Sequence, residues 1–307
     1  MKEFSLFTNT KFYPLFWTQF CGAFNDNVYK IALILLVTLQ ADDYMLWGFD
    51  RPQITYIAMG VFILPFFLFS ALAGQLADKY DKGFLIRRIK FVEIIIMTMG
   101  LIAFVNNNIG FLIIVLFFMG TQSTFFGPLK YSLLPQHLPT TALTAANGLI
   151  EMATFLAILL GTLFGGILIT LNAGGAITIG MTVVTIAIVG WATSQKIPDA
   201  PPPDATLKIR FNIFTQTFKQ IRFAARFKEL FIVIIGISWF WHLGATIMML
   251  LPMMSKTDFK TVEVLSTVFL TFLSIGIGIG SVLCDKLISG KASNHLIIIG
   301  ALGVSIF

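Results

Sequence analysis

Two ionisable residues, Asp26 and Lys30, lie in the middle of the long apolar stretch 12–39, and Asn25 and Asn27 flank the acid. A bilayer tolerates an ionisable group at that depth only where the group faces protein or water. Inserting a central Asp or Lys costs roughly 2.5 to 3.5 kcal/mol each. One helical turn apart, the two charges partly neutralise each other. We expect Asp26, Lys30 and Asn27 to line a hydrated cavity and to contact a polar headgroup or a coupling ion. The alternative is a structural ion pair that locks this helix to a neighbour.

A second polar group consists of Asn147 and Glu151 in the stretch 142–171 and Lys130 just after the stretch 109–129. Asn147 and Glu151 are one turn apart, and an acid beside an amide suits a quaternary amine, an ethanolamine headgroup or a shared proton. The alternative for Glu151 is an interhelical bond to a partner such as Lys130. Lys130 itself either reaches the lipid headgroups or points into the cavity, toward Glu151 or a lipid phosphate.

Three other features favour structural roles. Glu93 follows three basic residues of its own helix, so we expect local ion pairing there. Gly161 and Gly165 form a small-xxx-small pattern, which predicts close contact with another helix. His242 lies among aromatic residues and is interpreted as a packing residue.

The elements that must position these side chains are membrane-spanning helices. The chain is 57% hydrophobic and 12% charged, whereas soluble domains have about a quarter charged residues. A ninth apolar stretch begins near Asn294 and reaches only ~21 Å before Phe307, too short to cross. We expect an all-α membrane protein without a signal peptide. Stretches long enough to cross a core of ~30 Å lie at 12–39, 53–77, 84–105, 109–129, 142–171, 175–195, 229–252 and 262–284.

The basic residues predict the orientation. If the N-terminus is cytoplasmic, only Arg51, Lys256 and Lys260 of the 21 Lys and Arg residues fall in outside loops, while Lys30 is intramembrane. Such an excess of inside bases, Lys90 counted among them, fits the positive-inside rule. It also accounts for the net charge of +6, so we expect no nucleic-acid partner.

The segment 196–228 interrupts the pattern of spans. A Pro-rich linker is followed by apolar residues at helical spacing, interleaved with basic residues. This predicts an amphipathic helix at the cytoplasmic lipid interface. We therefore divide the chain into a six-helix bundle (1–195), a linker with this helix (196–228) and the start of a second bundle (229–307).

An internal repeat supports the two-bundle division. The segment 74–79 leaves the second span and 281–286 leaves the eighth, and each contains an Asp-Lys pair. Parallel six-helix repeats build one large class of transporters. We interpret Gly74, Asp78, Lys79 and Asp285 as gating or helix-capping groups.

The motif Gly74-x-Leu76-x-Asp78-Lys79 resembles the signature between the second and third helices of the major facilitator superfamily, although Asp81 stands where a glycine is usual. Further stretches resemble the lysophospholipid transporter family within it: 19–27, 126–131, 146–151 and 157–162. The resemblance implies a major facilitator-type helical bundle with a six-helix first half and a second half truncated in the ninth span.

The same resemblance implies a multi-pass protein of the bacterial inner membrane that flips lysophospholipids, such as lysophosphatidylethanolamine, by alternating access and supplies them for re-acylation. On this hypothesis we expect the lipid headgroup to be held by the polar residues singled out above: Asp26, Lys30, Asn27, Asn147, Glu151 and Lys130. Related chains continue into a cytoplasmic acyltransferase domain, which is a possible partner.

Other function classes lack their signatures. Three His and two Cys residues show no metal spacing, and no nucleophile elbow or phosphate-binding Gly-rich loop occurs. We expect a transporter without metal or cofactor rather than an enzyme, and no repeated filter points to a channel. One alternative is a proton-coupled carrier of a soluble solute or drug. Another is a membrane platform for an acyltransferase, which the cost of the intramembrane charges disfavours.

Overall fold

The computed structural model describes residues 6–41, 43–169, 174–257, 271–272, 275–280 and Leu283. Within these residues all regular elements are helices, as predicted, and only an isolated bridge joins Leu46 to Phe49. A short 3-10 turn, Thr140–Ala142, precedes the fifth helix. The helices are α1 (Tyr13–Thr38), α2 (Arg51–Lys79), α3 (Lys82–Val105), α4 (Ile109–His137), α5 (Leu143–Ile169), α6 (Gly175–Ser194), α7 (Ile213–Ala224) and α8 (Lys228–Thr257).

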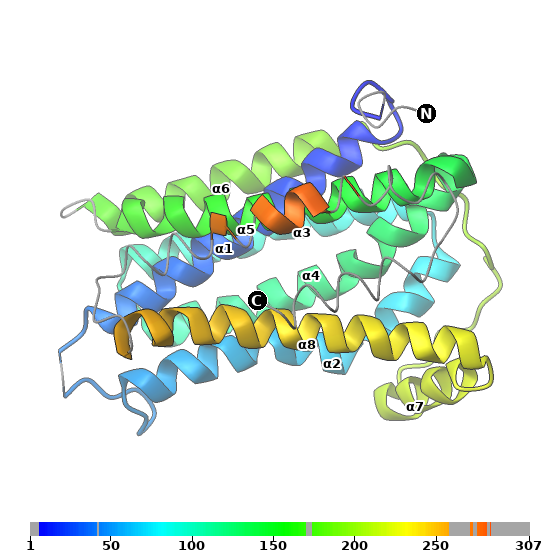
Figure 1. Cartoon of the computed structure of the whole chain (residues 1–307). Helices are drawn as coiled ribbons and strands as arrows, with labels where there is room; N and C mark the ends of the chain where they lie inside the picture. The colour runs from blue at the N-terminus through cyan, green and yellow to red at the C-terminus, as the bar shows by residue number, and fades with distance from the viewer. Residues whose placement is uncertain are drawn as a thin grey trace.

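Five of the described helices are long and apolar enough to cross a membrane: α1, α2, α4, α5 with its preceding turn, and α6. The hydropathy of α3 is reduced by five ionisable residues in its first half. The chain is therefore a multi-pass membrane protein. The long helices run side by side, and the short α7 lies near one end of α2 and α8 (Figure 1).

The helix contacts join distant parts of the sequence. α1 packs most extensively against α5 and also against α6, α3 packs against α6 and α4, and α2 packs against α4. At the contact of α1 with α5 glycine is required. A Cβ atom on Gly161 would lie 2.6 Å from the carbonyl oxygen of Phe24, and one on Gly165 would lie 2.8 Å from that of Val28. The predicted close contact of this strip is thus confirmed, with α1 as its partner.

Two apolar clusters form the core. One contains Val28, Leu33, Met97 and Leu116 among others. The second contains residues from the opposite ends of the same helices, including Leu133. α1, α3 and α4 each contribute to both clusters, and the stretch of each helix between the two clusters contains polar side chains.

α4 is longer than the sequence predicts. The predicted span 109–129 ended before Pro135 and Pro139, but α4 continues through Pro128 and Pro135 to His137. A proline inside a helix removes one backbone hydrogen bond. Burial of Leu133 and Leu134 against the second cluster offsets that loss.

The segment after α6 lies against the α2–α3 turn, at what we call the linker end of the bundle. Asp81 caps α3 by accepting a hydrogen bond from the Phe84 N–H (2.7 Å), and its other oxygen accepts one from the Ala200 N–H (2.6 Å). Arg87 donates to the carbonyl oxygen of Ile197 (2.9 Å) and to Asp199 (2.7 Å). Asp81, which departs from the family pattern, therefore has a structural function here.

Further along the same segment, a turn is held beside the end of α2. The Asp204 N–H donates to the carbonyl oxygen of Asp78 (3.0 Å). The Thr206 hydroxyl (2.6 Å) and N–H (3.0 Å) both donate to the Asp204 carboxylate and hold its pKa below the usual range. Gln75 exchanges two hydrogen bonds with the backbone of Arg210. The linker is thus bound to the first bundle over much of its length.

Substituting Asp81→Ala is expected to release this linker. The change removes a helix cap, worth about 1 kcal/mol, together with the bond to Ala200. Trypsin should then cleave faster at Lys208 and Arg210, as followed by mass spectrometry. Asp78→Ala is the matched control, because Asp78 holds the linker through its backbone. Equal cleavage of the two variants would contradict this function of Asp81.

Part of the sequence prediction falls outside the described residues. These are Asp285, most of the second copy of the repeat, the ninth stretch and more than half of the eighth span. The division of the chain into two bundles and a linker stays a prediction.

Candidate functional site

A group of polar side chains, which we call the polar layer, begins between the two apolar clusters at Asn25, Asp26, Gln122 and Ser123 and continues beside the second cluster at Lys130 and Glu151. Its side chains are joined by hydrogen bonds between helices, or lie within electrostatic range of one another. The layer consists of Gln19, Asn25 and Asp26 from α1, Lys90 and Glu93 from α3, Gln122, Ser123, Lys130 and Tyr131 from α4, and Glu151 and Thr154 from α5.

At the centre of the layer is a buried ion pair within α3. Lys90 Nζ lies 2.6 Å from Glu93 Oε2, and the two side chains are only 1% and 3% exposed. Asn25 of α1 donates to Glu93 at 3.3 Å, and Gln122 of α4 donates to it at 3.0 Å. One carboxylate therefore connects three helices.

This pair both confirms and corrects the sequence interpretation. The predicted local ion pairing of Glu93 is confirmed, with Lys90 as its partner. Counting Lys90 among the inside loop residues was wrong, because its ammonium group is buried beside the Phe126 ring, 4.8 Å from the centroid. A Cβ atom on Gly22 would lie 2.4 Å from Lys90 Nζ. The absence of a side chain on α1 at this point makes room for the lysine.

Asp26 is connected to this buried pair through α4. Ser123 Oγ donates to Asp26 at 3.0 Å and lies 3.3 Å from Gln122 Oε1. Gln122 in turn donates to Glu93. A chain of polar contacts thus leads from Asp26 through Ser123 and Gln122 to Glu93.

Asp26 and Lys30 point to different helices. In the part of the chain that the structure describes, no contact within 4 Å joins their charged atoms. Asp26 contacts Ser123 of α4, whereas Lys30 Nζ lies 4.6 Å from the centroid of the Phe62 ring of α2. Both side chains are half-buried. Their mutual neutralisation therefore acts at longer range than a contact ion pair.

On α4 and α5, the phenol of Tyr131 donates a hydrogen bond to Glu151. The sequence interpretation considered Lys130 as the partner of Glu151 and missed the adjacent tyrosine. Lys130 Nζ lies 4.7 Å from the centroid of the Tyr131 ring and within electrostatic range of Glu151, Lys90 and Asp26. Gln19 of α1 also reaches α5, where it donates to Thr154 at 2.8 Å.

The remaining predicted site residues lie apart from this network. Asn27 donates to the Ala23 carbonyl of its own helix at 2.7 Å. Asn147 is exposed and lies one turn from Glu151, toward the linker end. His242 of α8 lies beside Trp239, with 5.7 Å between the ring centroids.

The predicted gating residues of the first repeat copy lie together at the linker end of α2. Gly74 is next to α7, since a Cβ atom there would lie 3.9 Å from Gln220. Asp78 is exposed, and Lys79 Nζ lies 5.8 Å from the centroid of the Tyr80 ring.

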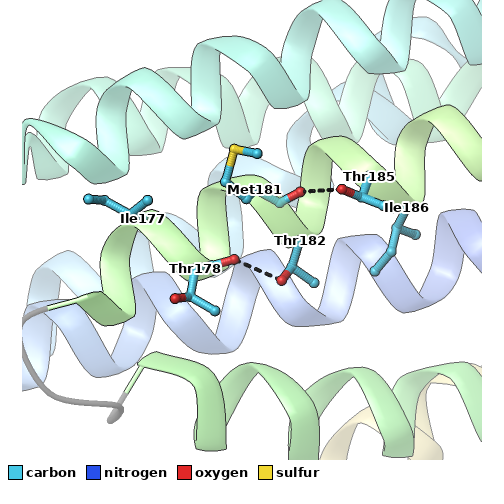
Figure 2. A pocket seen from close by; sticks show the side chains of 6 residues that line it. All are labelled: Ile177, Thr178, Met181, Thr182, Thr185 and Ile186. Atoms are coloured by element: carbon cyan, nitrogen blue, oxygen red, sulfur yellow. Dashed lines mark hydrogen bonds between the residues drawn. The ribbon is translucent and has the colours of Figure 1, made fainter.

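A surface hollow of about 400 Å³ on α6 does not coincide with the polar layer. Figure 2 shows its lining, which is made of Ile177, Thr178, Met181, Thr182, Thr185 and Ile186. The three threonine hydroxyls donate to backbone carbonyls one turn earlier. The hollow therefore suits contact with hydrocarbon. Among the described residues, no three His, Cys, Asp or Glu side chains gather closely enough to hold a metal ion.

Sequence comparisons give relatives over most of the chain. A profile of the Major Facilitator Superfamily matches residues 15–307. Proteins named lysophospholipid transporter LplT from Enterobacter sp. (strain 638) and Klebsiella pneumoniae (strain 342) are each 29% identical, over 88% of this chain and 64% of their own length. One of the same name from Yersinia enterocolitica is 26% identical, over 94% of this chain and 68% of its own. The chain spans just under two thirds of the length of the first two relatives.

Proposed function

The chain belongs to the major facilitator superfamily, and on that premise we propose that the full-length protein is a secondary transporter that flips lysophospholipids across the bacterial inner membrane. The observation that carries the proposal is the polar layer, which holds Asp26 between the two apolar clusters and Lys130 and Glu151 beside the second of them. The name of the relatives, lysophospholipid transporter, supports the same substrate class.

The charges of the layer suit a zwitterionic headgroup. The headgroup of lysophosphatidylethanolamine carries an ammonium and a phosphate, and charge-assisted hydrogen bonds to such groups are the strong ones. Asp26 and Glu151 would receive the ammonium, while Lys30 and Lys130 would receive the phosphate. Asn27 and Asn147 are assigned as flanking polar contacts.

The single acyl chain needs an apolar surface beside the headgroup site. A row of aromatic rings along α1 and α5 supports this requirement. Ring centroids are 5.6 Å apart for Trp17 and Phe20, 6.0 Å for Phe20 and Phe24, and 5.9 Å for Phe24 and Phe164 of α5. Trp17 and Phe164 are exposed.

We assign the linker end to the cytoplasm, because the basic residues concentrate there. The two bundles would then rock around the polar layer, and contacts at Gly74, Asp78, Lys79 and Asp285 would open and close on the cytoplasmic side. The flipped lipid would supply a cytoplasmic acyltransferase, either as a fused domain or as a separate protein.

Substituting Asp26→Asn is expected to reduce lysophospholipid transport by at least about tenfold. The amide keeps the size of the side chain and an acceptor for Ser123, but it loses a charge-assisted bond to the headgroup, worth roughly 1.5–3 kcal/mol. The measurement is the flipping of labelled lysophosphatidylethanolamine by the full-length protein in vesicles. Asp43→Asn is the matched control, since Asp43 lies in an exposed loop. The proposal fails if the wild type moves no labelled lipid or if Asp26→Asn transports normally.

One observation favours a second candidate function. The chain of contacts from Asp26 through Ser123 and Gln122 to Glu93 suits proton binding and release by a carrier of a soluble solute. Transport that collapses with the pH gradient and is indifferent to lysolipids would select that function.

A further inference from the structure

The short helix α7 carries a concentrated positive charge. Lys219 and Arg222 are about one turn apart on α7, and Arg226 lies in the turn that follows this helix. Together with Phe223 they line a hollow of about 410 Å³ on the surface. The hollow thus combines three cationic groups with one aromatic ring.

The described residues around α7 do not neutralise this charge. No acidic residue occurs between Asp204 and Glu229, in a stretch that also contains Lys208, Arg210 and Lys228. In the described part of the chain, Lys219, Arg222 and Arg226 form no ion pair within 4 Å. Within the part of the chain that the structure describes, these cationic groups are therefore available to an anionic ligand.

The neighbouring face of α7 is apolar and exposed. Phe214, Phe218 and Ile221 recur at helical spacing and are 69%, 67% and 53% exposed. Large exposed rings next to a basic face are typical of helices that lie in the membrane interface. A soluble anion would neutralise the basic face but leave the apolar face in water. A lipid would neutralise the basic face with its headgroup and bury the apolar face beside its acyl chains.

α7 is also fixed close to the membrane-spanning helices. Gln220 donates to the Ala71 carbonyl of α2 at 3.5 Å, and Gln75 of α2 holds the backbone of Arg210 just before α7. Figure 1 shows α7 beside the ends of α2 and α8. The basic face is thus held at the level where membrane helices end.

We propose that the hollow formed by Lys219, Arg222, Phe223 and Arg226 binds the headgroup phosphate of an anionic phospholipid from the adjacent leaflet. The apolar face of Phe214, Phe218 and Ile221 inserts beside that lipid's acyl chains. Clusters of basic residues on such a helix attract anionic lipids. This site is separate from the polar layer and does not depend on the transported substrate.

The test uses the full-length protein in phosphatidylcholine nanodiscs that contain labelled phosphatidylglycerol. The variant is Lys219→Gln/Arg222→Gln/Arg226→Gln. The matched control is Arg88→Gln/Lys196→Gln/Lys208→Gln, which removes the same charge from exposed positions outside the hollow. We expect the variant to hold labelled phosphatidylglycerol at least about tenfold more weakly than the wild type and the control.

Three results would overturn the proposal: wild-type affinity in the variant, an equal loss in the control, or complete displacement of the lipid by inorganic phosphate at low concentration. The first two would mean that the hollow contributes nothing beyond net charge, and the third would assign it to a soluble anion. Melting curves of all three proteins, and the single change Arg222→Gln, separate loss of binding from loss of fold.

Discussion

Lys90→Met and Glu93→Gln are each expected to destabilise the protein by about 3–5 kcal/mol, because each leaves the other charge buried and unpaired. The pair is almost fully buried, and Glu93 also accepts hydrogen bonds from Asn25 and Gln122. Each change therefore weakens the packing of α3 against both α1 and α4. The measurement is an unfolding titration of the purified protein in mild detergent.

The double variant Lys90→Met/Glu93→Gln is expected to recover most of that loss. It buries no charge, and the glutamine keeps an acceptor for the amides of α1 and α4. A double-mutant cycle then gives the coupling between the two residues. Arg88→Met is the control, because Arg88 is exposed on the same helix. If the two single changes add in the double variant, Lys90 and Glu93 do not stabilise each other and the prediction is contradicted.

The second large effect is expected from the seam between α1 and α5. In Gly161→Ala/Gly165→Ala, each new Cβ atom meets backbone oxygen of α1, at 2.6 Å from Phe24 and 2.8 Å from Val28. Overpacking of this kind costs about 1–3 kcal/mol per site. Because α1 also carries Asp26, its displacement should lower transport as well as stability. Thermal unfolding and vesicle transport of the same preparation measure the two effects.

Gly166→Ala is the neighbouring control for this seam. A Cβ atom there has Leu35 Cδ1 as its nearest neighbour, at 3.9 Å, which is ordinary contact. Alanine also favours a helix over glycine by roughly 0.5–1 kcal/mol. We therefore expect this variant to be as stable as the wild type or slightly more so. A control that loses as much stability as the double variant would show that the seam is not specially close.

The sequence predicts the helices of this protein better than their contacts. Hydropathy locates α1 to α6, because the cost of exposing each residue to lipid depends on that residue and its near neighbours. The glycine spacing at Gly161 and Gly165 predicts a close contact but not its partner. The resemblance to the superfamily and to lysophospholipid transporters is confirmed by the comparisons.

The interior of the polar layer is not predictable in the same way. From the sequence, Lys90 is counted with the basic residues of the inside loops. Its burial becomes evident only from its neighbours on α1 and α4, and the free-energy cost of burying it depends on them. Glu93 meets Gln122, 29 residues away, and Asn25, 68 residues away. Asp81 looked like a departure from a turn pattern, and only the linker contact at Ala200 explains it. Such pairs depend on tertiary packing, and the periodicity of apolar residues along the sequence does not predict them.

The binding of the linker to the first bundle has a consequence for alternating access. Residues 197–210 are held by Asp81, Arg87 and Gln75, and α7 is held by α2. If the full-length protein works by alternating access, we therefore expect these segments to move together with α2 and α3. On the predicted division into two bundles, the pivot for rotation would be the few residues between the end of α7 at Ala224 and the start of α8 at Lys228. A connection as short as this one would allow the two predicted bundles to rotate relative to each other but not to separate far.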